Sequence, residues 1–94
     1  MRVSWTPRAL AELEAIQDHI GQHNPTAAHR LVRRVFETAN TLLSRNPLIG
    51  RKGQIAETRE LVIAGTAYIV AYRVTSDQVE IAFVMHGARQ WPEA

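Results

Sequence analysis

The spacing of apolar residues predicts two consecutive helices in the first half of the chain. Apolar residues three and four positions apart predict a helix from residue 7 to about residue 22: Leu10, Leu13, Ile16 and Ile20. A longer stripe of the same periodicity predicts a second helix over residues 25–46. Both helices follow a start signal, Thr6-Pro7 and Asn24-Pro25, in which a capping side chain precedes a proline. Only about two residues separate the helices, so they form an antiparallel hairpin.

The second half of the chain has the pattern of strands. Stretches rich in Val, Ile and Tyr between polar turns predict three strands, at residues 58–63, 67–74 and 79–86. Residues 2–5 predict one more strand before the first helix. Residues 47–57 predict a basic loop that is longer than the usual connection of about 4–6 residues. The order β-α-α-β-β-β predicts an α+β fold in which a helical hairpin packs on one face of a small sheet.

A tight turn at Ser76-Asp77 sets the expected pairing of the last two strands. It places Arg73 opposite Glu80, which predicts a cross-strand ion pair. Continued without interruption, this register turns an apolar set toward the helices: Tyr68, Val70, Tyr72, Ile81, Phe83 and Met85. The opposite face then carries a mixed set: Ala67, Ile69, Arg73, Glu80, Val84 and His86. Such a face can remain open to water or to a partner.

The composition is that of a folded globular chain. Of 94 residues, 46% are apolar and 21% are charged, and this length predicts a single domain over residues 1–94. No apolar run approaches the roughly 18–20 residues of a membrane span. The N-terminus has no long apolar segment, so we expect no signal peptide. The absence of cysteine excludes disulfides, thiolate metal sites and cysteine nucleophiles.

Arginine dominates the positive charge. The formal net charge is +2, and Lys52 is the one lysine among eleven basic residues. Arg30, Arg33 and Arg34 form a basic ridge on the second predicted helix. The ridge is either a solvated helix face with local pairs to Glu37 or a docking strip for an acidic partner segment.

The histidines allow two kinds of chemistry. His19 and His23 stand four residues apart, a spacing that can place two imidazoles on one metal ion. No third ligand stands at a suitable distance, so we expect no metal and no cofactor. His86 could act as a general acid or base at the end of a strand, and Arg89 could hold a phosphate. Trp91 alternatively covers the end of the core.

Short motifs in a defined order connect these elements. They are Trp5, Ala9-x3-Leu13-x2-Ile16, Asn24-Pro25-x-Ala27-Ala28, Pro47-x2-Gly50-Arg51, Thr58-Arg59-Glu60-Leu61, Tyr68-Ile69-Val70-x-Tyr72-Arg73-Val74 and His86-x2-Arg89-x-Trp91. Together they resemble the RelE/ParE superfamily of type II toxin–antitoxin toxins. The resemblance implies a mostly antiparallel, curved sheet beneath the helical hairpin. It also implies a bacterial or archaeal cytoplasmic toxin that arrests growth and is neutralised by a tightly wrapped, DNA-binding antitoxin of the ParD/RelB type.

The superfamily divides by target. RelE-like members cut mRNA inside the ribosome, whereas ParE-like members poison DNA gyrase and are not nucleases. Ile69 stands where RNase members generally have an arginine, Trp91 stands where they tend to have a tyrosine, and the paired lysines that they often have are absent near Arg59. The resemblance therefore favours a ParE-like toxin that acts by binding.

Candidate residues for each role follow from the open sheet face, the basic loop and the charge of the second helix. Target binding is expected at Arg51, Lys52, Arg73, His86, Arg89 and Trp91, and antitoxin binding, by charge, at Arg30, Arg33 and Arg34. The alternative is a ribosome-dependent mRNA endonuclease that handles the scissile phosphate with Arg59, Arg73, His86 and Arg89. A third possibility is an inactive relative that binds only its antitoxin.

Overall fold

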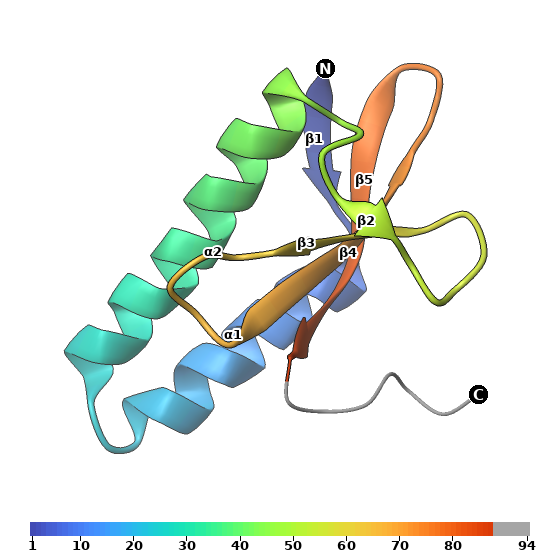
Figure 1. Ribbon diagram of the computed structural model, residues 1–94. Helices are drawn as coiled ribbons and strands as arrows, with labels where there is room; N and C mark the ends of the chain where they lie inside the picture. The colour runs from blue at the N-terminus through green and yellow to red at the C-terminus, as the bar shows by residue number, and fades with distance from the viewer. Residues whose placement is uncertain (88–94) are drawn as a thin grey trace.

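The first half of the chain forms a strand and a helical hairpin, as its apolar pattern predicts. The computed structural model describes residues 1–87. Strand β1 spans Arg2–Trp5, helix α1 spans Pro7–Gly21 and helix α2 spans Pro25–Arg45 (Figure 1). These bounds confirm the predicted strand and both predicted helices.

The helix starts follow the expected capping chemistry. The side chains of Thr6 and Asn24 accept hydrogen bonds from the backbone N–H groups of Ala9 and Ala27, each at 3.1 Å. Helix α2 ends just before Pro47, because the residue preceding a proline is disfavoured in the helical region. Within residues 1–87, neither helix combines the length and apolar character needed to cross a membrane.

The remaining elements are four strands. Strand β2 spans Arg51–Lys52, β3 spans Arg59–Val62, β4 spans Tyr68–Val74 and β5 spans Gln78–His86. The sheet has the order β1-β5-β4-β3-β2, in which β1 runs parallel to β5 and all other neighbours are antiparallel. The α+β class and the mostly antiparallel sheet are therefore confirmed.

One strand was not expected. Strand β2 lies inside the segment predicted to be a loop, where Arg51 pairs with Glu60 and Lys52 pairs with Arg59. Two residues are too short for an alternating pattern, so the strand is recognisable only by its pairing partner.

The core lies between the helices and one face of the sheet, which we call the helix face. Figure 1 shows both helices on this side of the sheet, while the β2–β3 connection projects on the other side. Buried residues of α1, α2, the strands and the position after β3 form the central cluster: Ala9, Leu13, Val35, Ala39, Leu43, Leu61, Ile63, Val70, Tyr72, Val79, Ile81 and Val84. Burial of these side chains is the main force that holds the hairpin on the sheet.

The predicted register of the β4–β5 hairpin is correct near its turn and wrong beyond Tyr72. Tyr72 lies opposite Ile81 as expected, but Ala71 lies opposite Phe83. Ala82 is therefore an extra residue in β5, and the ladder contains a β-bulge at this point.

The bulge exchanges the faces of the residues that follow it. Val84 belongs to the central cluster, whereas Phe83 clusters with Ala71 and Ala82, with Met85 packed against them. Our assignment of Phe83 and Met85 to the helix face, and of Val84 and His86 to the opposite face, is thus wrong. A single inserted residue reverses every later side chain because strand side chains alternate with a period of two.

Candidate target-binding site

The sheet face turned away from the helices, here called the outer face, has an apolar floor. On this face, the strand pairing forms two rows of side chains across β3, β4 and β5. One row contains Val62, Ile69 and Met85, and the next row contains Glu60, Ala71 and Phe83. Ile69 and Phe83 are 7% and 5% exposed, whereas Val62 at the margin is 51% exposed. A partner could therefore make apolar contacts at this margin.

A buried carboxylate interrupts the apolar floor and is paired with Arg51. The Glu60 side chain is 2% exposed, and its Oε1 lies 2.8 Å from Nη2 and 2.9 Å from Nε of Arg51. Its other oxygen accepts a hydrogen bond from the backbone N–H of Gln54 at 3.2 Å. Arg51, a predicted target-binding residue, therefore compensates an internal charge and holds β2 on β3.

Arg59 lies on the helix face and holds the segment before β2. It is opposite Tyr72, and its Nη1 donates to the carbonyl oxygens of Gly50 at 2.9 Å and Leu48 at 3.4 Å. The backbone N–H of Gly50 donates to the Tyr72 hydroxyl at 2.9 Å. Arg59, a candidate catalytic residue, is thus engaged with backbone carbonyls.

The Tyr72 hydroxyl makes the stability of the folded state decrease at alkaline pH. Burial raises the pKa of Tyr72 above 10.0, and the hydrogen bond from Gly50 and the charge of Arg59 only partly oppose this rise. The folded state therefore holds this proton more tightly than the unfolded state. The stability that the protonated Tyr72 hydroxyl contributes is complete below the ordinary pKa of about 10. It is lost as the pH rises through the pKa that Tyr72 has in the folded state.

We expect the unfolding free energy from urea denaturation to fall between pH 9 and pH 11, and to fall less in Tyr72→Phe. At pH 7 this variant should lose about 1–3 kcal/mol, because the Gly50 N–H is left without its acceptor. Tyr68→Phe is the matched control, since it removes the other tyrosine of the chain. Equal pH slopes in Tyr72→Phe and the parent protein would contradict the assignment.

Arg73 forms the predicted ion pair on the outer face. Its Nη1 lies 3.8 Å from Oε1 of Glu80, and the two side chains are 42% and 38% exposed. Such half-exposed ion pairs contribute about 0–1 kcal/mol to the free energy of unfolding. Arg73 can therefore exchange Glu80 for an acidic group of a partner at little cost.

His86 lies on the helix face and far from Arg73. It is opposite Tyr68 at the end of β5, with ring centroids 5.3 Å apart at an interplanar angle of 84°. Arg73 and Tyr68 are five positions apart along β4, which corresponds to roughly 16 Å. The structure therefore does not bring Arg73 and His86 together.

The remaining target-binding candidates lie at the sheet edge or outside the described residues. Lys52 is exposed on the short edge strand β2, opposite Arg59. Arg89 and Trp91 lie outside residues 1–87, so their expected roles stay predictions.

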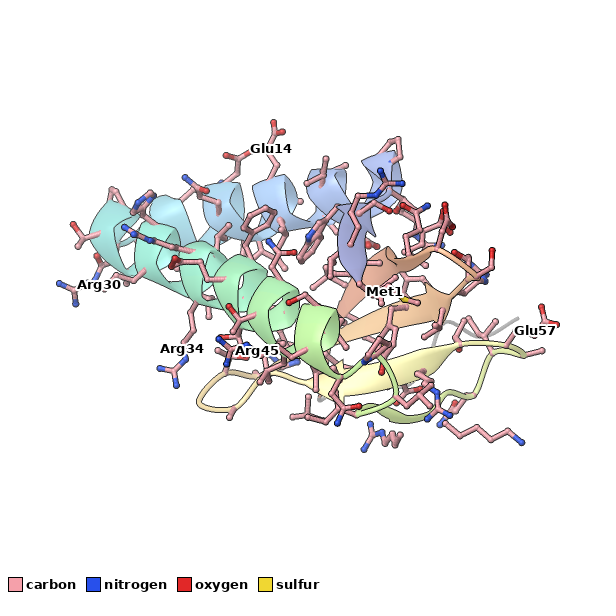
Figure 2. The ribbon with its side chains drawn as sticks, turned by 90° about the horizontal axis from the view of Figure 1, so that it is seen from above. Met1, Glu14, Arg30, Arg34, Arg45 and Glu57 are labelled. Atoms are coloured by element: carbon pink, nitrogen blue, oxygen red, sulfur yellow. The ribbon has the colours of Figure 1, made fainter. Side chains whose placement is uncertain are left out.

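The arginine ridge of α2 is exposed, and two of its members have local contacts. Nε of Arg33 lies 2.9 Å from Oε1 of Glu37, as the four-residue spacing predicts. The Arg34 guanidinium lies against Gly65 in the β3–β4 turn, so close that a Cβ on this glycine would meet Nη2 at 2.5 Å. Figure 2 shows Arg30 and Arg34 projecting from α2 away from α1.

The described part of the chain contains no cluster of potential metal ligands. Within residues 1–87, no group of three or more His, Cys, Asp or Glu side chains could hold a metal ion. His19 lies in the last turn of α1, where a positive charge would be favourable for the helix dipole.

Two residues beside the outer face were missed by the sequence reasoning. Glu60 is buried beside the β2–β3 edge, and Arg8 of α1 lies over Phe83, with its Cζ 4.6 Å from the ring centroid. Arg8 and Phe83 are far apart in the sequence, so no local pattern could reveal their contact. The segment Thr58-Arg59-Glu60-Leu61 placed Glu60 on a predicted strand, but its residue types do not indicate that Glu60 is buried.

Comparison with known proteins gives matches over nearly the whole chain. A family model described as the ParE toxin of the type II toxin–antitoxin system parDE matches residues 3–91. Y4kP of Sinorhizobium fredii is 47% identical over 92 residues, which cover 98% of this chain and 94% of that protein. Toxin RelE2 of Caulobacter vibrioides is 43% identical over 88 residues, which cover 94% of this chain and 97% of that protein.

Solved structures share the arrangement of helices and strands. The chromosomal ParDE system from P. aeruginosa matches with a TM-score of 0.83 at 26% identity, covering 92% of this chain and 95% of that chain. The intact E. coli RelBE toxin–antitoxin complex matches with a TM-score of 0.56 at 16% identity, covering 94% and 98%, and supports the fold alone. From the family model, the relatives and the fold together, the chain belongs to the ParE toxin family of type II toxin–antitoxin systems, within the RelE/ParE superfamily.

Proposed function

We propose that this toxin arrests growth by binding DNA gyrase and performs no bond cleavage of its own. The observation that carries the proposal is the separation of the candidate RNase residues. Arg73 is at the hairpin end of the outer face, His86 is on the helix face at the other end of β5, and Arg59 donates to backbone carbonyls. General acid–base catalysis requires such groups within hydrogen-bond reach of one substrate.

The middle strand adds to this argument. Ile69, 7% exposed on the outer face, occupies the position at which the RNase branch generally has an arginine. An aliphatic side chain cannot stabilise the negative charge that develops on a scissile phosphate. The ParE family match and the higher TM-score to the ParDE system support the same branch.

The proposed target contact is the outer face, with Arg73 as its cation. Arg73→Gln should weaken inhibition of gyrase supercoiling by about tenfold or more, as expected for a lost charged hydrogen bond. Glu80→Gln is the matched control, because it breaks the same ion pair but leaves the arginine in place. Equal losses in the two variants would show that the ion pair, and not a contact of Arg73 with gyrase, is responsible.

A second candidate function is ribosome-dependent mRNA cleavage, which the name of the 43% identical relative, toxin RelE2, favours. Translating ribosomes with a defined mRNA distinguish the two functions. We expect intact mRNA, together with inhibited supercoiling in a parallel gyrase assay. Cleavage that falls about 10²–10⁴-fold in His86→Gln would overturn the gyrase proposal and identify His86 as an acid or base.

We further propose that a cognate antitoxin with a DNA-binding part neutralises the protein in the cytoplasm. The structural neighbours include the ParDE system and the intact RelBE complex, each a toxin–antitoxin assembly. The exposed ridge of Arg30, Arg33 and Arg34 is the proposed contact for an acidic antitoxin segment.

A further inference from the structure

The outer edge of β5 changes partner where β1 ends. Up to Ile81 this edge pairs with β1, and the backbone N–H of Thr6 donates to the Ile81 carbonyl at 3.0 Å. The Thr6 hydroxyl then donates to the carbonyl of Ala82 at 2.8 Å. Carbonyls of consecutive residues alternate between the two edges of a regular strand. Two successive carbonyls on one edge are therefore the backbone signature of the bulge.

Helix α1 supplies the next partner along this edge. The backbone N–H of Val84 donates to Oε1 of Glu12 at 2.8 Å. On the opposite edge, the N–H of Gly87 donates to the Ala67 carbonyl at 2.6 Å. In a continuous register without the bulge, Val84 would turn its N–H toward β4. The hydrogen bond to Glu12 is therefore specific to the bulged register.

The residues of β5 do not select this register by themselves. Ala82, Phe83, Val84 and Met85 are all apolar, so either alternation would present apolar side chains to the helices. Register is weakly specified where both faces of a strand have the same character. Contacts outside the β4–β5 hairpin therefore contribute to the choice of register.

A contact from α1 also favours the observed position of Phe83. The Arg8 guanidinium lies over the Phe83 ring, and its Nε is 3.4 Å from Oε2 of Glu12. The carboxylate of Glu12 thus contacts both the Val84 backbone N–H and the Arg8 guanidinium, which lies above the Phe83 ring. In the continuous register, Phe83 would turn to the helix face and would leave its observed position beneath Arg8.

We infer that Glu12 is a positioning residue that holds β5 in the bulged register. It thereby determines that Phe83 and Met85 line the outer face and that Val84 and His86 lie on the helix face. The inference about register stands by itself. Its consequence for toxicity rests on the proposed function, in which the outer face contacts the target.

Solution NMR tests the inference directly. Val70 and Val84 are opposite each other in a pair without mutual backbone hydrogen bonds, so their Hα atoms should show a strong nuclear Overhauser effect. In Glu12→Ala we expect loss of this effect, a new one between Val70 and Phe83, and at least about tenfold faster exchange of the Val84 amide proton. Glu12→Gln keeps an acceptor oxygen and should retain the native pattern.

Glu14→Ala is the matched control, because Glu14 lies on the same helix and points away from the sheet (Figure 2). If Glu12→Ala does not fold, Glu12→Asp provides the test, since it keeps the charge and withdraws the carboxylate by one methylene. A native Val70–Val84 effect and native Val84 exchange in a folded Glu12→Ala or Glu12→Asp variant would overturn the inference. Altered register with unchanged inhibition of gyrase would instead overturn the outer face as the target contact, and the positioning role would stand.

Discussion

Replacing Arg51 with methionine is expected to destabilise the protein by about 3 kcal/mol, because it leaves a buried carboxylate without its counter-charge. Both Nε and Nη2 of Arg51 contact Oε1 of Glu60, whose side chain is 2% exposed. After the substitution, Glu60 retains the hydrogen bond from the Gln54 backbone and no adjacent cation among the contacts of residues 1–87. Urea denaturation at pH 7 measures the effect.

A second substitution should recover much of this loss. Arg51→Met combined with Glu60→Met removes both charges and places an apolar side chain beside Ala71, and such replacements of ion pairs are often neutral. Lys52→Met, on the same strand and exposed, should stay within about 0.5 kcal/mol of the parent protein. If Arg51→Met were as stable as Lys52→Met, the ion pair between Arg51 and Glu60 would have no role in folding. The predicted role of Arg51 in target binding would then regain support.

Replacing Gly50 with alanine is expected to cost about 2–3 kcal/mol through steric conflict. A Cβ at this position would lie 2.6 Å from the Tyr72 hydroxyl oxygen and 2.7 Å from the Glu60 carbonyl oxygen. The carbonyl belongs to the sheet backbone and cannot move aside, and Tyr72 is fully buried. The alanine must therefore displace the segment that joins α2 to β2.

Gly21→Ala is the control for this substitution. A Cβ there would meet Ala28 Cβ at 3.7 Å, an ordinary contact, and alanine in a helix is favoured over glycine by about 0.5–1 kcal/mol. Thermal denaturation of both variants should give a lower melting temperature for Gly50→Ala and an equal or higher one for Gly21→Ala. Equal melting temperatures for Gly50→Ala and the parent protein would contradict the close packing described here.

These two predictions affect how toxicity data are interpreted. Arg51 is a predicted target-binding residue, and Arg59 is a predicted catalytic one, yet each has an internal structural partner. Loss of toxicity in their variants would follow from damage at the β2–β3 edge as well as from a lost target contact. Arg73 is the better probe of the outer face, because its half-exposed pair with Glu80 contributes little to folding.

The local features of this protein followed from its sequence. The helical hairpin, its capping residues Thr6 and Asn24, and the end of α2 before Pro47 depend on neighbours within about one helical turn. The pair of Arg73 and Glu80 depends on a tight turn and was likewise predictable. The family was also recognisable, because its motifs are short segments whose order can be read along the chain.

Contacts between distant residues were decided by the tertiary structure. The bulge in β5 is accompanied by a hydrogen bond from Val84 to Glu12, 72 positions earlier in the chain, and no alternation of apolar residues could reveal it. Strand β2 exists through its pairing with β3, and the charge of the buried Glu60 is compensated by Arg51, which lies opposite. Sequence periodicity therefore determined which elements form. The faces of those elements, and hence the composition of the outer face, were determined by hydrogen bonds and charges that meet only after folding.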